Sequence, residues 1–288
     1  MTRANLHRFA AMGCEIVVAG AALPARRAVE RLFRERDLMF SRFIDDSELN
    51  RVNAAAGRPV RVSDEFARMV DVALDAAEES EGLVDPTVGA AITAAGYDVD
   101  FAFLPADGPA PRIPAPVCGR PIRLLGRLLL VDAGVKLDLN GVVKGATVDD
   151  ALALVGERGW IAAGGDVGTR AGEVVVALPG GGKVRVERGA IATSGTDRRQ
   201  WRRGGRRQHH LIDPRTGAPS DSPWQYVTAS AATCLGADVA AKVGFLRGTS
   251  GPGWLDERGI AARFVTRTGR EVVNEAWRRS LDPVLACT

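Results

Sequence analysis

Apolar residues recur along this chain with two periods, one typical of helices and one typical of strands. Two segments show the three- and four-residue spacing of an amphipathic helix, one beginning at Pro24 and one directly after Ser63. Ser63 is also a favourable residue to cap the first turn of a helix. Further helices are expected from about Gly145 to Val155 and from about Leu235 onward.

Short segments on either side of glycine-containing turns predict β-structure in much of the remaining chain. Residues 6–19 alternate well enough to predict a single strand. Three β-hairpins are also expected. Their strands are predicted at 122–125 with 128–131, at 174–178 with 183–187, and at 200–203 with 206–211. Together with the helices, these strands indicate the α+β class.

The chain is long enough to bury a sizeable core, with 288 residues of which 46% are hydrophobic and 25% are charged. A proline-rich stretch, 101–121, predicts a loop or an extended surface segment that could separate two lobes of a single domain over 1–288. No run approaches the roughly 18 apolar residues of a membrane span, and no secretion signal is recognised at the start. A cytoplasmic protein without a membrane span is therefore expected.

Neither the net charge nor the cysteines indicate a special partner. A net charge of +3 is too small to imply a polyanionic ligand by itself. The cysteines lie far apart without a Cys-x-x-Cys pair, so neither a zinc site nor a disulfide framework is indicated. Reduced, buried thiols are expected at Cys14, Cys118, Cys234 and Cys287.

The segment 209–217 combines reactive side chains with a defined backbone geometry. Pro214 favours an extended conformation for Asp213, which must then project from a strand end or a turn. His210 stands just before this turn, and a histidine can take or give a proton near neutral pH. By itself the motif also fits a hairpin exit with a capped turn and two half-exposed histidines.

Two other turns could bind a ligand. In the segment 137–147, a strand leads through a glycine-containing turn into a helix, so free backbone N–H groups and the Lys144 ammonium could hold a phosphate. The spacing is not that of a nucleotide-triphosphate P-loop, and a plain strand-to-helix connection fits equally well. Asp85 precedes Pro86 at a bend that could recognise a planar ring or an amide, although an isolated turn is the simpler interpretation.

Two charged residues, Asp238 and Lys242, fall one helical turn apart within an otherwise apolar helix face. Charges on such a face are costly to bury unless they are paired. They could form an ion pair with each other, or Asp238 could bind Mg²⁺ beside a diphosphate.

Seven motifs in a fixed order give the chain a specific resemblance to the ApbE family of FAD:protein FMN transferases, from Met12 to about Gly248. The motifs lie at 12–13, 41–53, 85–89, 138–145, 163–166, 192–195 and 210–217. The resemblance implies an α+β fold of two lobes with mixed or antiparallel sheets, flanking helices and FAD in the cleft. It also implies transfer of the FMN moiety of FAD to a threonine or serine hydroxyl of an acceptor protein, with release of AMP and with Mg²⁺ at the diphosphate.

The same resemblance assigns roles to individual residues. His210 would be the catalytic histidine, and Mg²⁺ would be held by the Gly141 carbonyl and the Asp238 carboxylate. Lys242 stands where the family usually has a further threonine or serine ligand, so it is open whether Mg²⁺ is used or is replaced by this lysine. The residues that would line the FAD site are Met12, Phe43, Leu83, Val84, Asp85, Asp138, Lys144 and Ile212.

Three functions other than flavin transfer are also compatible with parts of the sequence. An FAD diphosphatase that forms FMN and AMP, or a non-catalytic FAD-binding protein, would share the same site. Six arginines between 198 and 207 flank Trp201, a combination that is compatible with nucleic-acid contact. They fall on both faces of a short predicted hairpin, however, so we expect no nucleic-acid partner.

Overall fold

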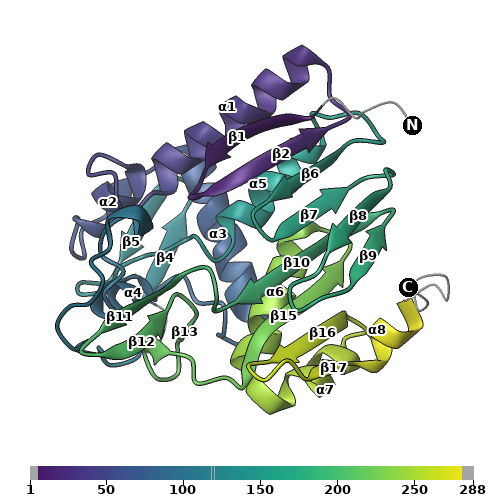
Figure 1. Ribbon diagram of the computed structural model, residues 1–288. Helices are drawn as coiled ribbons and strands as arrows, with labels where there is room; N and C mark the ends of the chain where they lie inside the picture. Colours follow the sequence, from purple (N-terminus) through teal and green to yellow (C-terminus); the bar gives the residue numbers. More distant parts are fainter. Residues whose placement is uncertain (1–5, 118, 120, 281–288) are drawn as a thin grey trace. The chain divides into compact units, whose positions relative to one another are not determined.

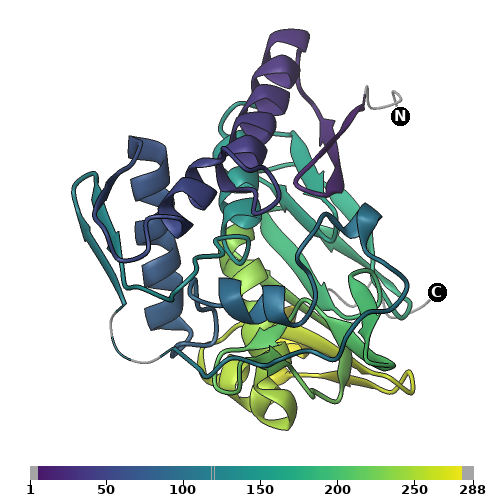
Figure 2. The same cartoon turned by 90° about the vertical axis from the view of Figure 1, so that its left-hand side faces the viewer.

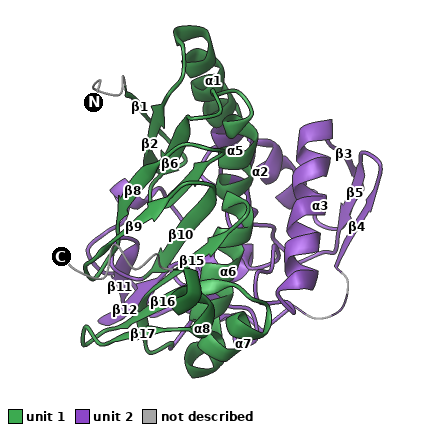
Figure 3. Ribbon diagram, turned by 90° about the vertical axis from the view of Figure 1, so that its right-hand side faces the viewer, with its two compact units in different colours: residues 1–35, 144–195, 222–288 green, residues 36–143, 196–221 purple. Residues whose placement is uncertain are grey.

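The computed structural model describes residues 6–117, 119 and 121–280. The chain divides into two compact units, shown in different colours in Figure 3. Unit 1 is formed by residues 1–35, 144–195 and 222–288, and unit 2 by residues 36–143 and 196–221. The stretch 101–121, where a boundary between lobes was expected, falls inside unit 2.

Unit 1 is built on an eight-stranded sheet in which every neighbouring pair of strands is antiparallel (Figure 1). Its strands, in spatial order, are β1 (His7–Ala11), β2 (Cys14–Ala19), β6 (Trp160–Ala163), β7 (Asp166–Thr169), β10 (Gly189–Gly195), β15 (Trp224–Ala231), β16 (Ala261–Thr266) and β17 (Glu271–Val273). A separate hairpin consists of β8 (Val174–Ala177) and β9 (Lys183–Val186).

Helices cover one face of this sheet and close a hydrophobic core. The core combines residues of β1, β2, β6 and β10 with residues of α1, α5 and α6, including the fully buried Ile16, Phe33, Val148 and Ile161. The helices of this core are α1 (Leu23–Phe40), which continues into unit 2, α5 (Val143–Leu152) and α6 (Cys234–Leu246). Unit 1 also contains α7 (Gly251–Glu257), the short 3₁₀ helix η2 (Gly248–Ser250) and α8 (Glu275–Ser280), whose Trp277 packs in a second cluster with Val167 and Ile191. Each of the helices expected from the sequence is present.

The first strand was predicted wrongly as one continuous element over 6–19. The structure has two strands, β1 and β2, which pair from Ala11 with Cys14 outward. Met12 and Gly13 form the turn between them with φ angles of 52° and 66°. Two consecutive left-handed residues close a two-residue hairpin, and methionine is an unusual residue in this conformation. The alternation of apolar and polar residues therefore continues through the turn, and Met12 at its first position is not a residue type that predicts a turn.

Helices α5 and α6 approach each other closely at Gly145 and Leu235. A Cβ atom at Gly145 would lie 2.8 Å from the Cα of Leu235. Asp149 of α5 accepts hydrogen bonds from the backbone N–H groups of Cys234 and Leu235, at 2.6 and 2.9 Å. Burial raises the pKa of the Asp149 carboxyl, while these two donors favour its ionised form. Thr233 is the N-cap residue of α6, and its hydroxyl accepts a hydrogen bond from the N–H of Gly236. The start of α6 is thus fixed by residues of both helices.

Gly145→Ala should lower the free energy of unfolding by about 1–3 kcal/mol, because the added methyl group meets backbone that must move. Urea unfolding followed by circular dichroism measures this loss. Gly253→Ala is the matched control, since it is also a helical glycine but has open space around its Cβ position. Equal unfolding midpoints for Gly145→Ala and the unaltered protein would contradict the close packing described here.

Unit 2 contains α3 (Asp64–Glu79), beside which lies a small sheet in the order β3, β5, β4 (Figures 2 and 3). Ser63 caps α3 as expected, because its hydroxyl accepts a hydrogen bond from the backbone N–H of Phe66. The remaining elements are α2 (Glu48–Asn53), α4 (Gly89–Ala94), η1 (Phe101–Phe103), β3 (Val60–Arg61), β4 (Ile122–Leu125), β5 (Leu128–Val131), β11 (Gln200–Arg203), β12 (Arg206–His209), β13 (Ile212–Asp213) and β14 (Ala218–Pro219).

The hairpin β11–β12 is anchored on one side only. Trp201 is buried and donates from its indole nitrogen to the carbonyl of Ala95, at 2.7 Å. Arg203 is also buried and donates to the carbonyl of Gly96. The neighbouring Arg202 is exposed. In the ladder Arg202 pairs with Arg207 and Arg203 with Arg206, so the arginines of the hairpin are divided between its two faces, as expected.

The hairpins, the membrane-span expectation and the cysteines complete the comparison of sequence and structure within the described residues. The three predicted hairpins are confirmed, and α5 begins two residues earlier than predicted. A membrane-crossing helix, long and apolar over its whole length, is not found in the described part of the chain. Cys234 is buried as expected, Cys14 is only half-buried, and Cys118 and Cys287 lie outside the described residues.

Candidate functional site

The residues predicted to form the site are distributed over both units. Met12, Lys144 and Asp238 belong to unit 1. Those in unit 2 are Phe43, Leu83, Val84, Asp85, Asp138, Gly141, His210 and Ile212.

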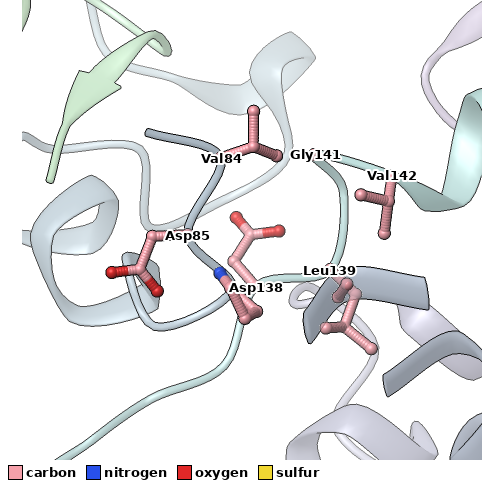
Figure 4. A pocket seen from close by; sticks show the side chains of 8 residues that line it. Val84, Asp85, Asp138, Leu139, Gly141 and Val142 are labelled. Carbon is pink, nitrogen blue, oxygen red and sulfur yellow. The ribbon is translucent and has the colours of Figure 1, made fainter. Parts of the chain in front are cut away.

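A pocket in unit 2 brings together four of the predicted residues. Two segments that are distant in the sequence, one following α3 and one preceding α5, form most of its wall. Figure 4 shows Val84 and Asp85 from the first segment beside Asp138 and Gly141 from the second. The lining residues are Ala73, Val84, Asp85, Pro86, Asp138, Leu139, Gly141 and Val142.

Backbone contacts hold these two segments side by side. The N–H of Asp138 donates to the carbonyl of Pro86 at 2.8 Å, and the N–H of Gly89 donates to the carbonyl of Lys136 at 3.0 Å. A Cβ atom at Gly89 would lie only 2.6 Å from that Lys136 oxygen. Gly89 is therefore required for the close approach that places Asp85 beside Asp138.

Both carboxylates at this pocket are engaged with their own surroundings. The Asp85 carboxylate accepts hydrogen bonds from the N–H and the hydroxyl of Thr87, each at 2.7 Å. The buried Asp138 carboxylate forms an ion pair with the guanidinium of Arg42 at 2.9 Å and accepts from the N–H of Asn140 at 2.8 Å. These contacts fix the shape of the two turns.

Arg42 connects the pocket with a group of aromatic side chains. Its guanidinium lies 4.8 Å from the ring centroid of Phe43 and 5.0 Å from that of Tyr97, and it donates to the Tyr97 carbonyl. Phe43 and Ile212 both pack in the hydrophobic cluster that contains Tyr97 and Trp201. Burial raises the pKa of the Tyr97 hydroxyl. Sequence analysis missed Arg42 and Tyr97, although Arg42 is adjacent to the predicted Phe43.

The two histidines of the 209–217 motif have different surroundings. His209 is buried at the end of β12, and its Nε2 lies 3.0 Å from the Ser220 carbonyl oxygen. His210 is half-buried, directly after the strand. Asp213 projects from the end of β13, as predicted, and its carboxylate binds both the N–H and the guanidinium of Arg215. His210 is thus the more accessible histidine at a well-ordered turn.

Four charged residues in unit 1 form what we call the lysine–aspartate cluster: Lys144, Asp166, Asp238 and Lys242. Lys144 lies in the first turn of α5, Asp166 begins β7 after the Gly164-Gly165 turn, and the other two lie on α6. Lys242 pairs with Oδ1 of Asp238, which confirms the ion pair expected from their spacing. Lys144 pairs with Asp166, and its Nζ lies 3.9 Å from Oδ2 of Asp238.

The residues present do not fit a Mg²⁺ ion at Asp238. Its Oδ1 is paired with the Lys242 ammonium and the Lys144 ammonium lies 3.9 Å from its Oδ2, and a protonated lysine has no lone pair to offer a metal. Nowhere among the described residues do three His, Cys, Asp or Glu side chains gather as potential ligands. Gly141, the other predicted ligand, lines the pocket of unit 2.

Comparison with known proteins decides the family. The sequence model of the ApbE family matches residues 11–264, which is most of the chain. The chain belongs to the ApbE family. This match includes the pocket of unit 2, the 209–217 motif and the lysine–aspartate cluster of unit 1.

Individual relatives and structures agree with membership of the ApbE family. The FAD:protein FMN transferase of Treponema pallidum is 29% identical over 78% of this chain and 71% of its own length. That of Chlamydia pneumoniae is 27% identical over 79% of each protein. The ApbE crystal structure from Thermotoga maritima covers 96% of this chain and 99% of its own, with a TM-score of 0.82 and 23% identity. The apo flavinyl transferase ApbE of Pseudomonas stutzeri covers 96% of each chain, with a TM-score of 0.80 and 22% identity. The fold expected from the resemblance is therefore confirmed.

Proposed function

We propose that this ApbE-family chain is an FAD:protein FMN transferase, which transfers the FMN moiety of FAD to a threonine or serine hydroxyl of an acceptor protein. The observation that carries the proposal is the match of the ApbE family to residues 11–264. Three residues that the sequence motifs assign to the FAD site, Val84, Asp85 and Asp138, also line one small pocket of unit 2 although they come from two distant segments. Gly141, which the motifs assign to Mg²⁺, lines the same pocket. The relatives named FAD:protein FMN transferases support the same activity.

The proposed reaction is a phosphoryl-type transfer. The acceptor hydroxyl oxygen forms a bond to the phosphorus of the FMN moiety, while the bond from that phosphorus to the bridging oxygen breaks and AMP leaves. The hydroxyl proton passes to a base, for which we propose His210. His210 is half-buried, whereas His209 is buried with its Nε2 at the Ser220 carbonyl. The main contributions of the protein would be to position the two substrates and to compensate the phosphate charge.

For FAD binding we propose a division between apolar and charged residues. The apolar side chains would contact the flavin and adenine parts, which are planar and largely apolar. Asp85 would bind polar groups of FAD, and Asp138 would act through the turn that it holds in place. Lys144 would compensate the diphosphate charge from the first turn of α5. The proposed apolar contacts are Met12, Phe43, Leu83, Val84 and Ile212.

Lys144→Met should weaken FAD binding about tenfold, because it removes a charge-assisted contact but keeps most of the side-chain stem. The deficit should become smaller at ~0.5 M salt, where exposed charges are screened. Flavin fluorescence titration at low and high salt measures both effects. Lys183→Met, at an exposed position of β9, is the control and should bind FAD normally.

Lys144 also pairs with the buried Asp166, so the melting temperature must be measured alongside FAD affinity. A folded Lys144→Met variant that retains FAD as well as the unaltered protein would remove Lys144 from the proposed site.

Release of AMP from FAD separates the transferase from two other activities of the same site. A transferase should release most of its AMP only when a small acceptor domain with a modifiable threonine or serine is added. A diphosphatase would release AMP and FMN without the acceptor, because water would attack in place of the hydroxyl. A binding protein would be saturated by FAD and release no AMP. Mass spectrometry of the acceptor should show the attached FMN in the first case alone.

A further inference from the structure

The Asp238 carboxylate is enclosed by positive charge. It is 5% exposed, with the Lys242 ammonium at Oδ1 and the Lys144 ammonium 3.9 Å from Oδ2. Lys144 is in turn paired with Asp166, whose side chain is 2% exposed. The cluster contains two ammonium groups and two carboxylates, so its formal charges cancel without any added ion.

Such a cluster disfavours a divalent cation for two reasons. A carboxylate oxygen that binds Mg²⁺ must offer its lone pairs, and here Oδ1 is already paired with the Lys242 ammonium, while the Lys144 ammonium lies 3.9 Å from Oδ2, close enough to repel a cation but beyond hydrogen-bond distance. A divalent ion at Asp238 would also lie close to two ammonium groups in a poorly solvated region, where repulsion between like charges is strong. Displacing Lys242 would leave its ammonium without its partner on a helix whose other residues are mostly buried.

The two ammonium groups retain donor capacity toward an anion. An ammonium has three N–H donors, and the contacts with Asp238 and Asp166 use only some of them. The side chains of Lys144 and Lys242 are 25% and 16% exposed, whereas the carboxylates beneath them are almost fully buried. The accessible side of the cluster is therefore its cationic side.

We propose that Lys242, together with Lys144, serves as a built-in replacement for a divalent cation, so that this chain binds the diphosphate of FAD without a metal ion. The inference rests on the proposed function, because it concerns the substrate of that same site. Asp238 and Asp166 act as positioning residues that hold the two ammonium groups close together despite their mutual repulsion.

The test uses two measurements on the unaltered protein. Flavin fluorescence gives the FAD dissociation constant in excess chelator and in millimolar Mg²⁺, and we expect the two values to agree within about twofold. Electron paramagnetic resonance with Mn²⁺, a spectroscopic substitute for Mg²⁺, should show no protein-bound ion, with or without FAD. An affinity about tenfold lower in chelator, or one bound Mn²⁺ per chain, would overturn the inference and leave the proposed function intact. Failure to bind FAD under either condition would overturn both.

Two variants at Lys242 make the test specific. Lys242→Thr removes the ammonium and supplies a hydroxyl oxygen one helical turn from Asp238. This variant should bind FAD about tenfold more weakly in chelator, recover in Mg²⁺ and bind Mn²⁺. Lys242→Arg keeps the charge, and its FAD affinity should stay insensitive to Mg²⁺.

If Lys242→Thr binds FAD with the unaltered affinity in chelator, the Lys242 ammonium makes no contribution and the inference is wrong. The measurements on the unaltered protein remain decisive if either variant fails to fold.

Discussion

His210→Ala should lower the rate of acceptor-dependent AMP release by about 10²- to 10⁴-fold, the range typical of a lost general base, while FAD still binds. The acceptor hydroxyl is a poor nucleophile until its proton is removed, and we propose that the half-buried His210, which follows β12, accepts that proton. Single-turnover measurement of AMP release, together with flavin fluorescence titration, separates the rate from the affinity.

His209→Ala is the matched control, because it removes a neighbouring imidazole of the same chemistry. The Nε2 of His209 lies 3.0 Å from the Ser220 carbonyl in a buried environment, so this variant should lose stability and keep most of the turnover rate of its folded fraction. An inactive but stable His209→Ala variant beside an active His210→Ala variant would exchange the two proposed roles.

Asp138→Ala should destabilise the protein by about 3–5 kcal/mol, the usual cost of removing one partner of a buried ion pair. The side chains of Arg42 and Asp138 are 8% and 6% exposed, so the guanidinium would lose its compensating charge without gaining water. The N–H of Asn140 would lose its acceptor as well. The turn that leads to Gly141 would then be released, and FAD binding should fail together with stability. Urea unfolding and FAD titration measure the two losses.

The exposed pair between Arg123 and Asp132 provides the comparison for Asp138. It has the same chemical groups in the same unit, but its side chains are 60% and 47% exposed. Asp132→Ala should therefore change stability by only about 0–1 kcal/mol. Similar unfolding midpoints for the two alanine variants would show that burial does not determine the contribution of Asp138.

Several elements could be predicted from the sequence because their causes are local. The α3 helix follows from a serine cap and an apolar stripe, both confined to consecutive turns. The three predicted hairpins follow from glycine-containing turns between short strands. The Asp238–Lys242 pair follows from helical spacing alone, since residues four apart share one face.

Other features were missed or left open for an equally physical reason. The turn at Met12 and Gly13 interrupts an alternating pattern through a backbone conformation that methionine rarely adopts. The α2 helix contains only six residues, too few for a clear apolar period. Its start is fixed by the Ser47 hydroxyl, which accepts from Asn50 and donates to the Ser41 carbonyl.

The sequence by itself therefore determined the main helices, the hairpins and the order of the site motifs, because each depends on residues that are neighbours in the chain. The tertiary structure alone decided which charges meet. Asp138 is paired with Arg42, and Lys144 with Asp166, although the partners are distant in sequence. Such pairs depend on how separate segments pack, and burial then makes each unpaired charge too costly to tolerate. For the same reason, only the folded chain shows that the Asp238 carboxylate, paired with Lys242, also has the Lys144 ammonium 3.9 Å away.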